Sequence, residues 1–296
     1  MNLEKKTKLI HLTHCSSMTW KAIYALLKHD SSLKNLYQYS SFDFENLFSF
    51  SREQATRLKK DLQTIPIQDI LDNYEAEQIQ CITFWDNEYP ELLRHIYDPP
   101  WVLYVKGDTS LLKSKQVVSV VGTRQPTQYG YAALRTVINP LVENNWLIVS
   151  GLAEGIDTAA HKLAIESQGK TIAVLGSGMY HIYPSKNKEL AKIIAKQHLL
   201  LSEYPPTFRP KKWYFPMRNR IISGLSLGTI VVQAKERSGS FITADQALQQ
   251  GREVFAIPGS IFEETSCGTN KLIQLGAKLV LTAKDVCEEL YVNKSK

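Results

Sequence analysis

The chain has 296 residues, of which 44% are apolar, and a net charge of +6. This length accommodates two domains or one large α/β domain with an appendage, and the mild positive charge permits an anionic partner without requiring one. An N-terminus without a long apolar core predicts no secretion signal, and no apolar run reaches the roughly 18 residues of a membrane span.

The four cysteines, Cys15, Cys81, Cys267 and Cys287, stand far apart in the sequence. None of them has the spacing of a metal ligand or a redox pair, so we expect reduced thiols in a cytoplasmic protein. The histidines show no metal-ligand spacing with carboxylates either. We therefore expect neither a metal site nor a cofactor.

Residues 1–75 have the pattern of short helices. Apolar residues recur at helical spacing over 20–27 and 67–74, whereas the Ser/Asp/Phe-rich stretch from Ser40 to Ser51 has turn character. We interpret residues 1–75 as a small helical module, similar to sterile-alpha-motif (SAM-like) domains, used for packing or protein contacts. Residues 76–115 form a connecting extension, with short strands expected at 79–84 and 101–105.

From residue 116 to 296 short β-branched runs alternate with helical stretches. Strands are predicted at 117–121, 147–149, 171–175, 199–201, 229–232, 253–257 and 278–281. Apolar stripes at 134–142 and 190–194 predict helices, the first of which should kink or end early at Pro140. Such alternation predicts an α/β fold with a doubly wound, mostly parallel sheet.

Several predicted strands end in glycine or small polar residues. The turns contain Gly122-Thr123-Arg124, Ser150-Gly151, Gly176 and Pro258-Gly259. Glycine turns at the carboxyl ends of parallel strands let a ligand approach backbone N–H groups, and Arg124 adds a fork that suits phosphate. We favour a phosphate-bearing ligand over purely structural glycines. No G-x-G-x-x-G or Walker A motif supports a dinucleotide or nucleotide hydrolysis.

Two other stretches are candidates for anion binding. Ser238-Gly239-Ser240 precedes a predicted helix and is interpreted equally as an anion cradle and as a helix N-cap. Residues 205–220 are basic and aromatic without an acidic residue, and they contain Arg218, Asn219 and Arg220 at the start of another helix. Aromatic residues at 213–215 are candidates for stacking on bases, although Phe215 also suits a core position.

Asp157 and His161 are four residues apart on a predicted helix and share a face, with Glu154 nearby. We favour structural roles for them over a base with its orienting partner. No catalytic residue is assigned, because no nucleophile motif occurs and the spacing of the residues demands no reaction.

The ordered motifs between about residues 80 and 282 resemble the DNA-processing protein A family (DprA, also called Smf). The matching segments are Val121 to Arg124, Tyr129-Gly130, Ser150 to Asp157 with Ala160-His161, Gly169 to Gly176, Tyr183-Pro184, Ser202 to Pro205, Phe215 to Ile222, Ser238 to Ala244, Gly251 to Val254, Pro258-Gly259, and Leu272 to Ala277.

This resemblance implies a non-enzymatic, extended Rossmann-like protein that binds and protects incoming single-stranded DNA. It also implies a homodimer that loads the recombinase RecA during natural transformation and displaces single-strand-binding protein. Gly122, Thr123 and Arg124 correspond to the family's Gly-Ser-Arg motif, and Lys186 to a basic DNA contact. Leu272, Ile273 and Leu279 are expected at the dimer interface.

The full set of expected DNA contacts combines the glycine turns with the basic residues: Gly122, Thr123, Arg124, Ser150, Gly151, Gly176, Lys186, Arg218, Asn219, Arg220, Ser238, Gly239 and Ser240. The alternative is a nucleotide-processing enzyme of a phosphoribohydrolase-like Rossmann group, whose Pro-Gly-Gly-x-Gly-Thr motif is not continued after Pro258-Gly259. We expect no winged helix after the core.

Overall fold

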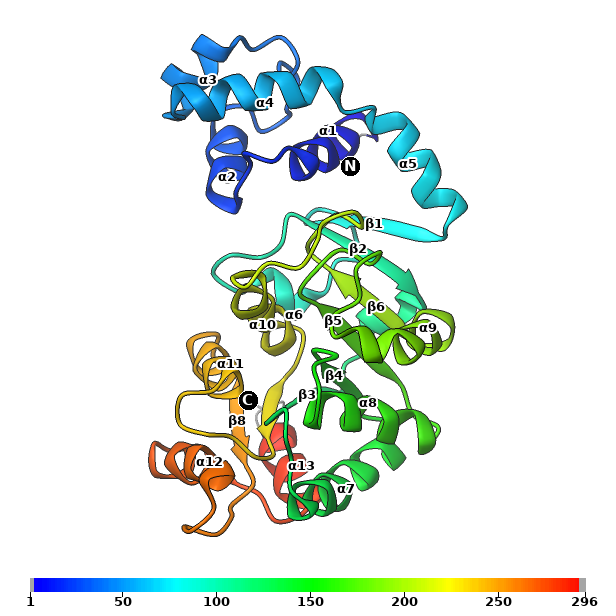
Figure 1. The fold of residues 1–296 in the computed structure, drawn as a ribbon, viewed down its shortest axis with the longest axis vertical. Coiled ribbons are helices and arrows are strands. Elements are labelled where there is room, and N and C mark those ends of the chain that lie inside the picture. Colours follow the sequence, from blue (N-terminus) through cyan, green and yellow to red (C-terminus); the bar gives the residue numbers. More distant parts are fainter. Residues whose placement is uncertain (1–2, 293–296) are drawn as a thin grey trace.

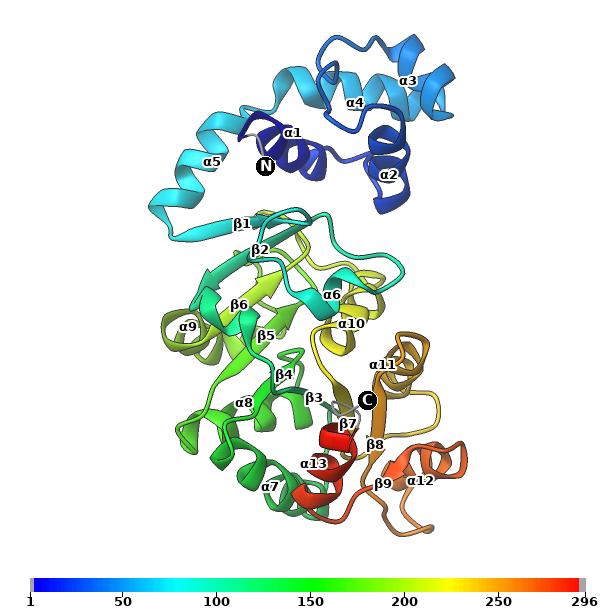
Figure 2. The same ribbon diagram turned by 180° about the vertical axis from the view of Figure 1, so that it is seen from behind.

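The computed structural model describes residues 3–292, and a single mixed sheet forms its centre. The strands are β1 (Ile79–Thr83), β2 (Val102–Gly107), β3 (Val117–Val121), β4 (Leu147–Ser150), β5 (Thr171–Leu175), β6 (Leu199–Ser202), β7 (Gly228–Val231), β8 (Glu253–Ala256) and β9 (Lys278–Leu279). Their order across the sheet is β1-β2-β6-β5-β4-β3-β7-β8-β9 (Figures 1 and 2).

The strands from β6 to β9 in this order are parallel, whereas β2 is antiparallel to both β1 and β6. The chain adds β4, β5 and β6 on one side of β3, then crosses back and adds β7, β8 and β9 on the other. This reversal confirms the doubly wound fold, and it places the topological switch point between β3 and β7.

Helices cover both faces of the sheet: α7 (Gln128–Glu143), α8 (Ile156–Glu166), α9 (Lys188–Gln197), α10 (Tyr214–Gly224), α11 (Gly239–Gln249), α12 (Glu264–Gln274) and α13 (Ala283–Val292). Alternate residues of β3 divide between the faces. Val118 and Val120 pack with α7, α8 and α13, whereas Val117 and Val121 pack in the core that contains α10, α11 and α12.

Pro140 lies inside α7 but does not end it, because the helix continues to Glu143. The expectation of an early end is therefore wrong. No helix within residues 3–292 combines the length and the apolar character needed to cross a membrane.

The N-terminal region is helical, with α1 (Leu3–His14), α2 (Trp20–His29), α3 (Ser41–Phe48), α4 (Arg52–Thr64) and α5 (Ile67–Ala76). The expectation of turn structure between Ser40 and Ser51 is wrong, because most of this stretch is α3. Ser40 accepts a hydrogen bond from the Asp43 backbone N–H, and the Asp43 carboxylate accepts one from the Ser40 N–H. This capping box satisfies two amide donors at the helix start.

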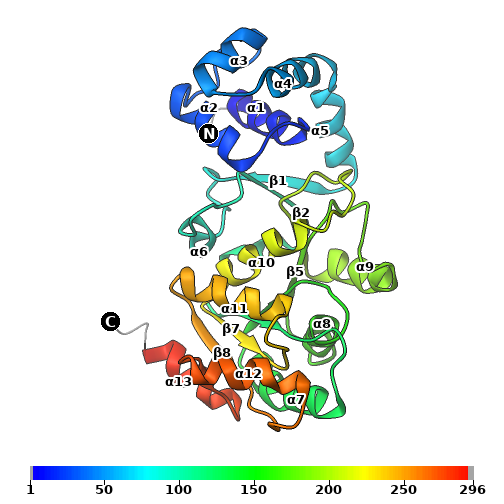
Figure 3. The ribbon, with the colours of Figure 1, turned by 60° about the vertical axis from the view of Figure 1, so that its left-hand side comes forward.

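The helical module packs directly on β1 and β2 (Figure 3). The Thr13 hydroxyl lies 2.6 Å from the hydroxyl of Tyr104, which is fully buried on β2. The Trp101 indole donates to the Trp20 carbonyl at 3.1 Å, and the Trp20 indole donates to the Pro99 carbonyl at 2.7 Å. Apolar residues of the module and of this sheet face form one continuous cluster. A short helix, α6 (Glu91–Arg94), lies between β1 and β2 in the chain.

Candidate functional site

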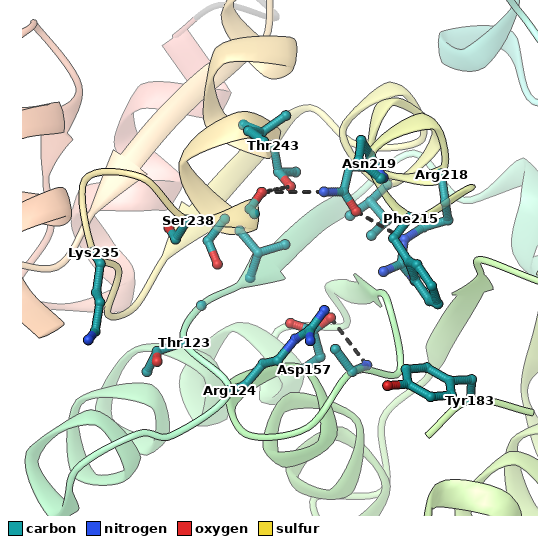
Figure 4. Close-up of a pocket in the computed structure, with 18 of the residues that line it drawn as sticks. Thr123, Arg124, Asp157, Tyr183, Phe215, Arg218, Asn219, Lys235, Ser238 and Thr243 are labelled. Carbon is teal, nitrogen blue, oxygen red and sulfur yellow. Dashed lines mark hydrogen bonds between the residues drawn. The ribbon is translucent and has the colours of Figure 1, made fainter. Parts of the chain in front are cut away.

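A pocket of about 490 Å³ opens beyond the carboxyl ends of β3 and β7, at the switch point of the sheet (Figure 4). It is formed by the turn after β3, the loop before α8, the start of α10 and the start of α11. The lining residues are Val121, Gly122, Thr123, Arg124, Ala153, Asp157, Tyr183, Lys212, Phe215, Pro216, Arg218, Asn219, Ile222, Lys235, Ser238, Gly239, Ser240, Ile242 and Thr243.

The turn after β3 brings Arg124 to the pocket through a fixed backbone. The Thr123 N–H donates to the Gln233 carbonyl at 2.7 Å, and the Thr123 carbonyl accepts from the Ile156 N–H at 3.1 Å. Gly122 is required here, because a Cβ atom at this position would lie 2.6 Å from the Ile156 side chain. Arg124 itself is exposed, and its side chain extends along the pocket (Figure 4).

The N-terminus of α11 faces the pocket opposite this turn. The Ser238 hydroxyl accepts from the Phe241 N–H at 3.3 Å, which confirms the N-cap interpretation. Gly239 is exposed, and a Cβ atom there would meet nothing within 4 Å. The positive end of the helix and an open backbone are thus available to an anion, so capping and anion binding are compatible at this position.

Arg218 lies beneath the pocket and holds its floor together. Its guanidinium donates to the carbonyls of Gly151 and Val174, the latter at 2.6 Å, and to Asn219 Oδ1 at 3.0 Å. Burial lowers the pKa of Arg218 to about 10, and Asp157 opposes this shift. The Asn219 amide in turn donates to the Gly239 carbonyl at 3.3 Å, which connects α10 to α11.

Arg220 does not line the pocket and is buried on another side of α10. It forms ion pairs with Glu203 at 2.6 Å and with Asp98 at 3.1 Å. Burial raises the pKa of Glu203, while the charge of Arg220 acts in the opposite direction. Because its charge is already neutralised inside the protein, we do not propose Arg220 as a DNA contact.

Ser150, Gly151 and Gly176 also lie below the pocket surface. The buried Ser150 hydroxyl donates to the Val120 carbonyl at 2.6 Å, so it connects β4 to the neighbouring strand β3. Gly151 and Gly176 leave room for Arg218 and Phe215, because a Cβ atom would lie 2.5 Å from the Arg218 guanidinium and 2.7 Å from the Phe215 ring, respectively. These three residues shape the site from beneath.

Lys186 is exposed on a short 3-10 helix, Ser185–Asn187, directly before α9, and it is not among the residues that line the pocket. Its ammonium forms an ion pair with Glu154 at 2.6 Å. Glu154 lines a smaller adjoining cavity together with Arg124, so Lys186 stands at the outer rim of the site.

Asp157 and His161 make structural contacts, the roles favoured for them from their positions in the sequence. The Asp157 carboxylate accepts from the Gly151 and Ala153 N–H groups at 3.1 and 3.4 Å, and its burial raises its pKa. The fully buried His161 ring lies 2.7 Å from the Thr171 hydroxyl, and burial lowers its pKa to about 3. The two side chains bond to different partners and show no acid–base arrangement.

The pocket residues absent from the predicted set include two aromatic side chains, Tyr183 and Phe215, and two lysines, Lys212 and Lys235. The ring centroids of Tyr183 and Phe215 are 5.4 Å apart, and the two rings form an aromatic wall of the pocket. Lys212 belongs to the acid-free stretch 205–220, which was the signal for it in the sequence. Lys235 forms an exposed ion pair with Glu264 at 2.6 Å, and no sequence pattern pointed to it.

The residues expected at a dimer interface differ in exposure. Leu272 is buried in the core, Ile273 is partly buried, and Leu279 is 41% exposed. Leu275 and Leu281 are exposed nearby. Leu272 therefore belongs to the core, whereas Leu279 and these two neighbours lie at the surface.

Comparisons with known proteins agree on one family. A family model described as DNA recombination-mediator protein A matches residues 80–291. The DNA processing protein DprA of Bacillus subtilis is 49% identical over 248 residues, which cover 82% of this chain and 84% of that protein. DprA of Streptococcus pneumoniae is 49% identical over 223 residues, which cover 75% of this chain and 78% of that protein.

Solved structures show the same likeness. An X-ray structure of DprA from Streptococcus pneumoniae has a TM-score of 0.84 and 40% identity, covering 96% of this chain and 97% of that one. A structure of DprA from Helicobacter pylori, described for its single-stranded DNA binding mode, has a TM-score of 0.66 and 33% identity, covering 73% of this chain and 97% of that one. The chain belongs to the DNA recombination-mediator protein A family.

Proposed function

We propose that this protein is a non-enzymatic binder of single-stranded DNA whose primary site is the pocket between β3 and β7. The observation that carries the proposal is the convergence of Arg124, Lys212 and Lys235 with the open N-terminus of α11 on one cavity. Separate segments of the chain thus direct positive charge and N–H donors to one place, which suits a phosphodiester backbone.

Each part of the pocket has a distinct role in this proposal. Arg124 binds a phosphate through its planar fork, and the N–H groups at the start of α11 bind a second phosphate. Lys212 and Lys235 contribute charge at the rim. Tyr183 and Phe215 offer aromatic surface for a base, which favours single strands because their bases are unstacked and accessible. Lys186 makes a weaker contact with a phosphate after its ion pair with Glu154 breaks.

The wider role that we propose is delivery of the bound strand to the recombinase RecA, with displacement of single-strand-binding protein during natural transformation in the cytoplasm. Membership of a recombination-mediator family supports it, as does the single-stranded DNA binding described for the Helicobacter pylori relative. We further propose that the protein acts as a homodimer through the surface around Leu279. The structural roles of Asp157 and His161 support a role without catalytic turnover.

The test is fluorescence anisotropy with labelled oligo(dT), compared with a duplex of equal length, for the wild type and Arg124→Ala. We expect tighter binding of the single strand and a large loss in the variant. Loss of one phosphate contact should also reduce the slope of log K against log salt by about 0.7. Equal affinity of variant and wild type at moderate salt would falsify the site.

A further inference from the structure

A second cavity, of about 640 Å³, lies between the helical module and the sheet domain. The module contributes the end of α1 and the start of α2, and the opposite wall is the segment from Glu203 to Arg220. Figures 1 and 2 both show α2 facing α10 across this region. We call the cavity the inter-module groove. Of the expected DNA contacts, the buried Arg220 alone lines it, but the basic, aromatic stretch 205–220 singled out in the sequence forms much of one wall.

Aromatic rings line the groove in pairs. Trp20 and Trp101 stack with ring centroids 5.4 Å apart, and Tyr204 and Tyr214 stack at 3.7 Å. Trp213 is different, because 64% of its surface is exposed and it contributes little to the core. A large apolar ring held in water beside a cavity offers a flat surface on which a planar group can stack.

The groove is also positively charged. Arg209 and Lys211 line it, and within residues 3–292 no carboxylate forms an ion pair with either. The Lys211 ammonium lies 5.5 Å from the centroid of the Trp213 ring. The acidic side chain in the lining, Glu203, is neutralised by Arg220. Cations beside an exposed aromatic ring are complementary to a chain of alternating phosphates and bases.

The groove and the primary pocket share a wall. Within the short segment 211–217, Lys212, Phe215 and Pro216 line the pocket, whereas Lys211, Trp213, Tyr214 and Met217 line the groove. Neighbouring residues thus face the two cavities from one turn of chain at the start of α10. Lys212 at the pocket and Trp213 at the groove are thus consecutive residues on the shared wall.

We propose that the inter-module groove is a second subsite for the same single DNA strand, in which Trp213 stacks on a base and Arg209 and Lys211 bind its phosphates. The inference rests on the proposed function, and it adds a path for the strand out of the pocket toward the helical module. Two features favour DNA over a peptide as the occupant. Segment 211–217 lines both cavities, and Arg209 and Lys211 have no carboxylate partner among residues 3–292.

The experiment measures the affinity of the full-length protein for a series of oligo(dT) lengths from about 4 to about 16 nucleotides, the range of footprints seen in single-strand-binding folds. Trp213→Ala should leave the shortest oligomers unaffected and weaken the longest by about tenfold, as expected for loss of one stacked base. Trp213→Phe, which keeps an aromatic face, should restore most of the affinity. Phe42→Ala removes another exposed ring, on α3, and is the matched control.

Salt dependence separates stacking from charge. Trp213→Ala should leave the slope of log K against log salt unchanged, whereas Arg209→Ala should reduce it for long oligomers only. Lys196→Ala, an exposed cation on α9, should change neither. Thermal unfolding of each variant checks that the fold is retained.

Arg124→Ala distinguishes failure of the two proposals. If that variant weakens all lengths while Trp213→Ala has no effect at any length, the groove does not bind DNA and a protein segment becomes its candidate occupant. A loss in Trp213→Ala that is equal at all lengths also overturns the second subsite, because Trp213 would then belong to the primary pocket. If Arg124→Ala binds every length as the wild type does, the primary pocket is wrong, whatever the groove contributes.

Discussion

Arg218 and Arg220 are two residues apart on α10, yet the guanidinium of Arg218 bonds to backbone carbonyls and that of Arg220 to carboxylates. Arg218 donates to the Gly151 and Val174 carbonyls under the pocket, whereas Arg220 pairs with Glu203 and Asp98. Helix geometry explains the difference, because residues two apart do not share a face. Both side chains thus make structural contacts inside the protein, although both belong to the most basic motif of the chain.

Arg220→Ala should destabilise the fold. The substitution leaves the buried Glu203 carboxylate without its partner, and loss of one member of a buried pair costs about 3 to 5 kcal/mol. Denaturant unfolding of the variant measures this free energy, with Arg209→Ala as an exposed arginine control. A loss below about 1 kcal/mol would show that Glu203 is solvated or protonated without cost.

Glu154→Gln should strengthen binding of single-stranded DNA by a few fold. The change removes a negative charge from the rim and releases Lys186 from its ion pair. The effect is small, because an exposed pair is worth about 0.2 to 1 kcal/mol. Lys186→Ala should conversely weaken binding less than Arg124→Ala does. Anisotropy titrations at one fixed salt concentration measure both, and an unchanged affinity in Glu154→Gln would place Lys186 outside the DNA path.

Gly176→Ala should disturb the aromatic wall of the pocket. Its new methyl group would lie 2.7 Å from the Phe215 ring, so the ring must move, at a cost of about 1 to 3 kcal/mol. Gly239→Ala is the matched control for stability alone, since a methyl group there meets no protein atom and a helical alanine is favourable. The denaturant midpoint should fall for Gly176→Ala only, and the oligo(dT) affinity of Gly176→Ala should fall with it. Equal denaturant midpoints of the two variants would contradict the packing of Phe215 on Gly176.

Acidification should destabilise the protein partly through His161. Its pKa is about 3 in the folded chain and near 6.5 when unfolded, so below pH 6.5 the unfolded state binds a proton that the folded state does not. From pH 7 to pH 5 this difference lowers the free energy of unfolding by about 2 kcal/mol. The non-titrating His161→Asn keeps a polar atom near Thr171 and should show a correspondingly smaller pH slope. Equal slopes would exclude His161 as the titrating group.

The strands, and the edge of the sheet at which the site lies, could be predicted from the sequence. The individual roles of the arginines could not. Continuous apolar runs identify strands buried on both faces, and glycines mark the turns that form the pocket floor. Arg220 could not be assigned, because its partners Glu203 and Asp98 are distant in sequence and become neighbours only through the fold. Lys235 joins the pocket for the same reason. The helix α3 was missed although Ser40 and Asp43 have capping-box spacing, since its short, phenylalanine-rich sequence gives no clear apolar stripe.

The contact between Thr13 and Tyr104 couples the unfolding of the helical module to that of the sheet. Because the helical module and the first antiparallel pair share one apolar cluster, neither can lose its structure without uncovering the other. Calorimetry should accordingly show one cooperative transition for the whole chain, rather than an early transition of the module. A protein shortened to begin at β1 would present Trp101 and Tyr104 to water and tend to aggregate, so contributions of the module are better dissected with surface substitutions than by truncation.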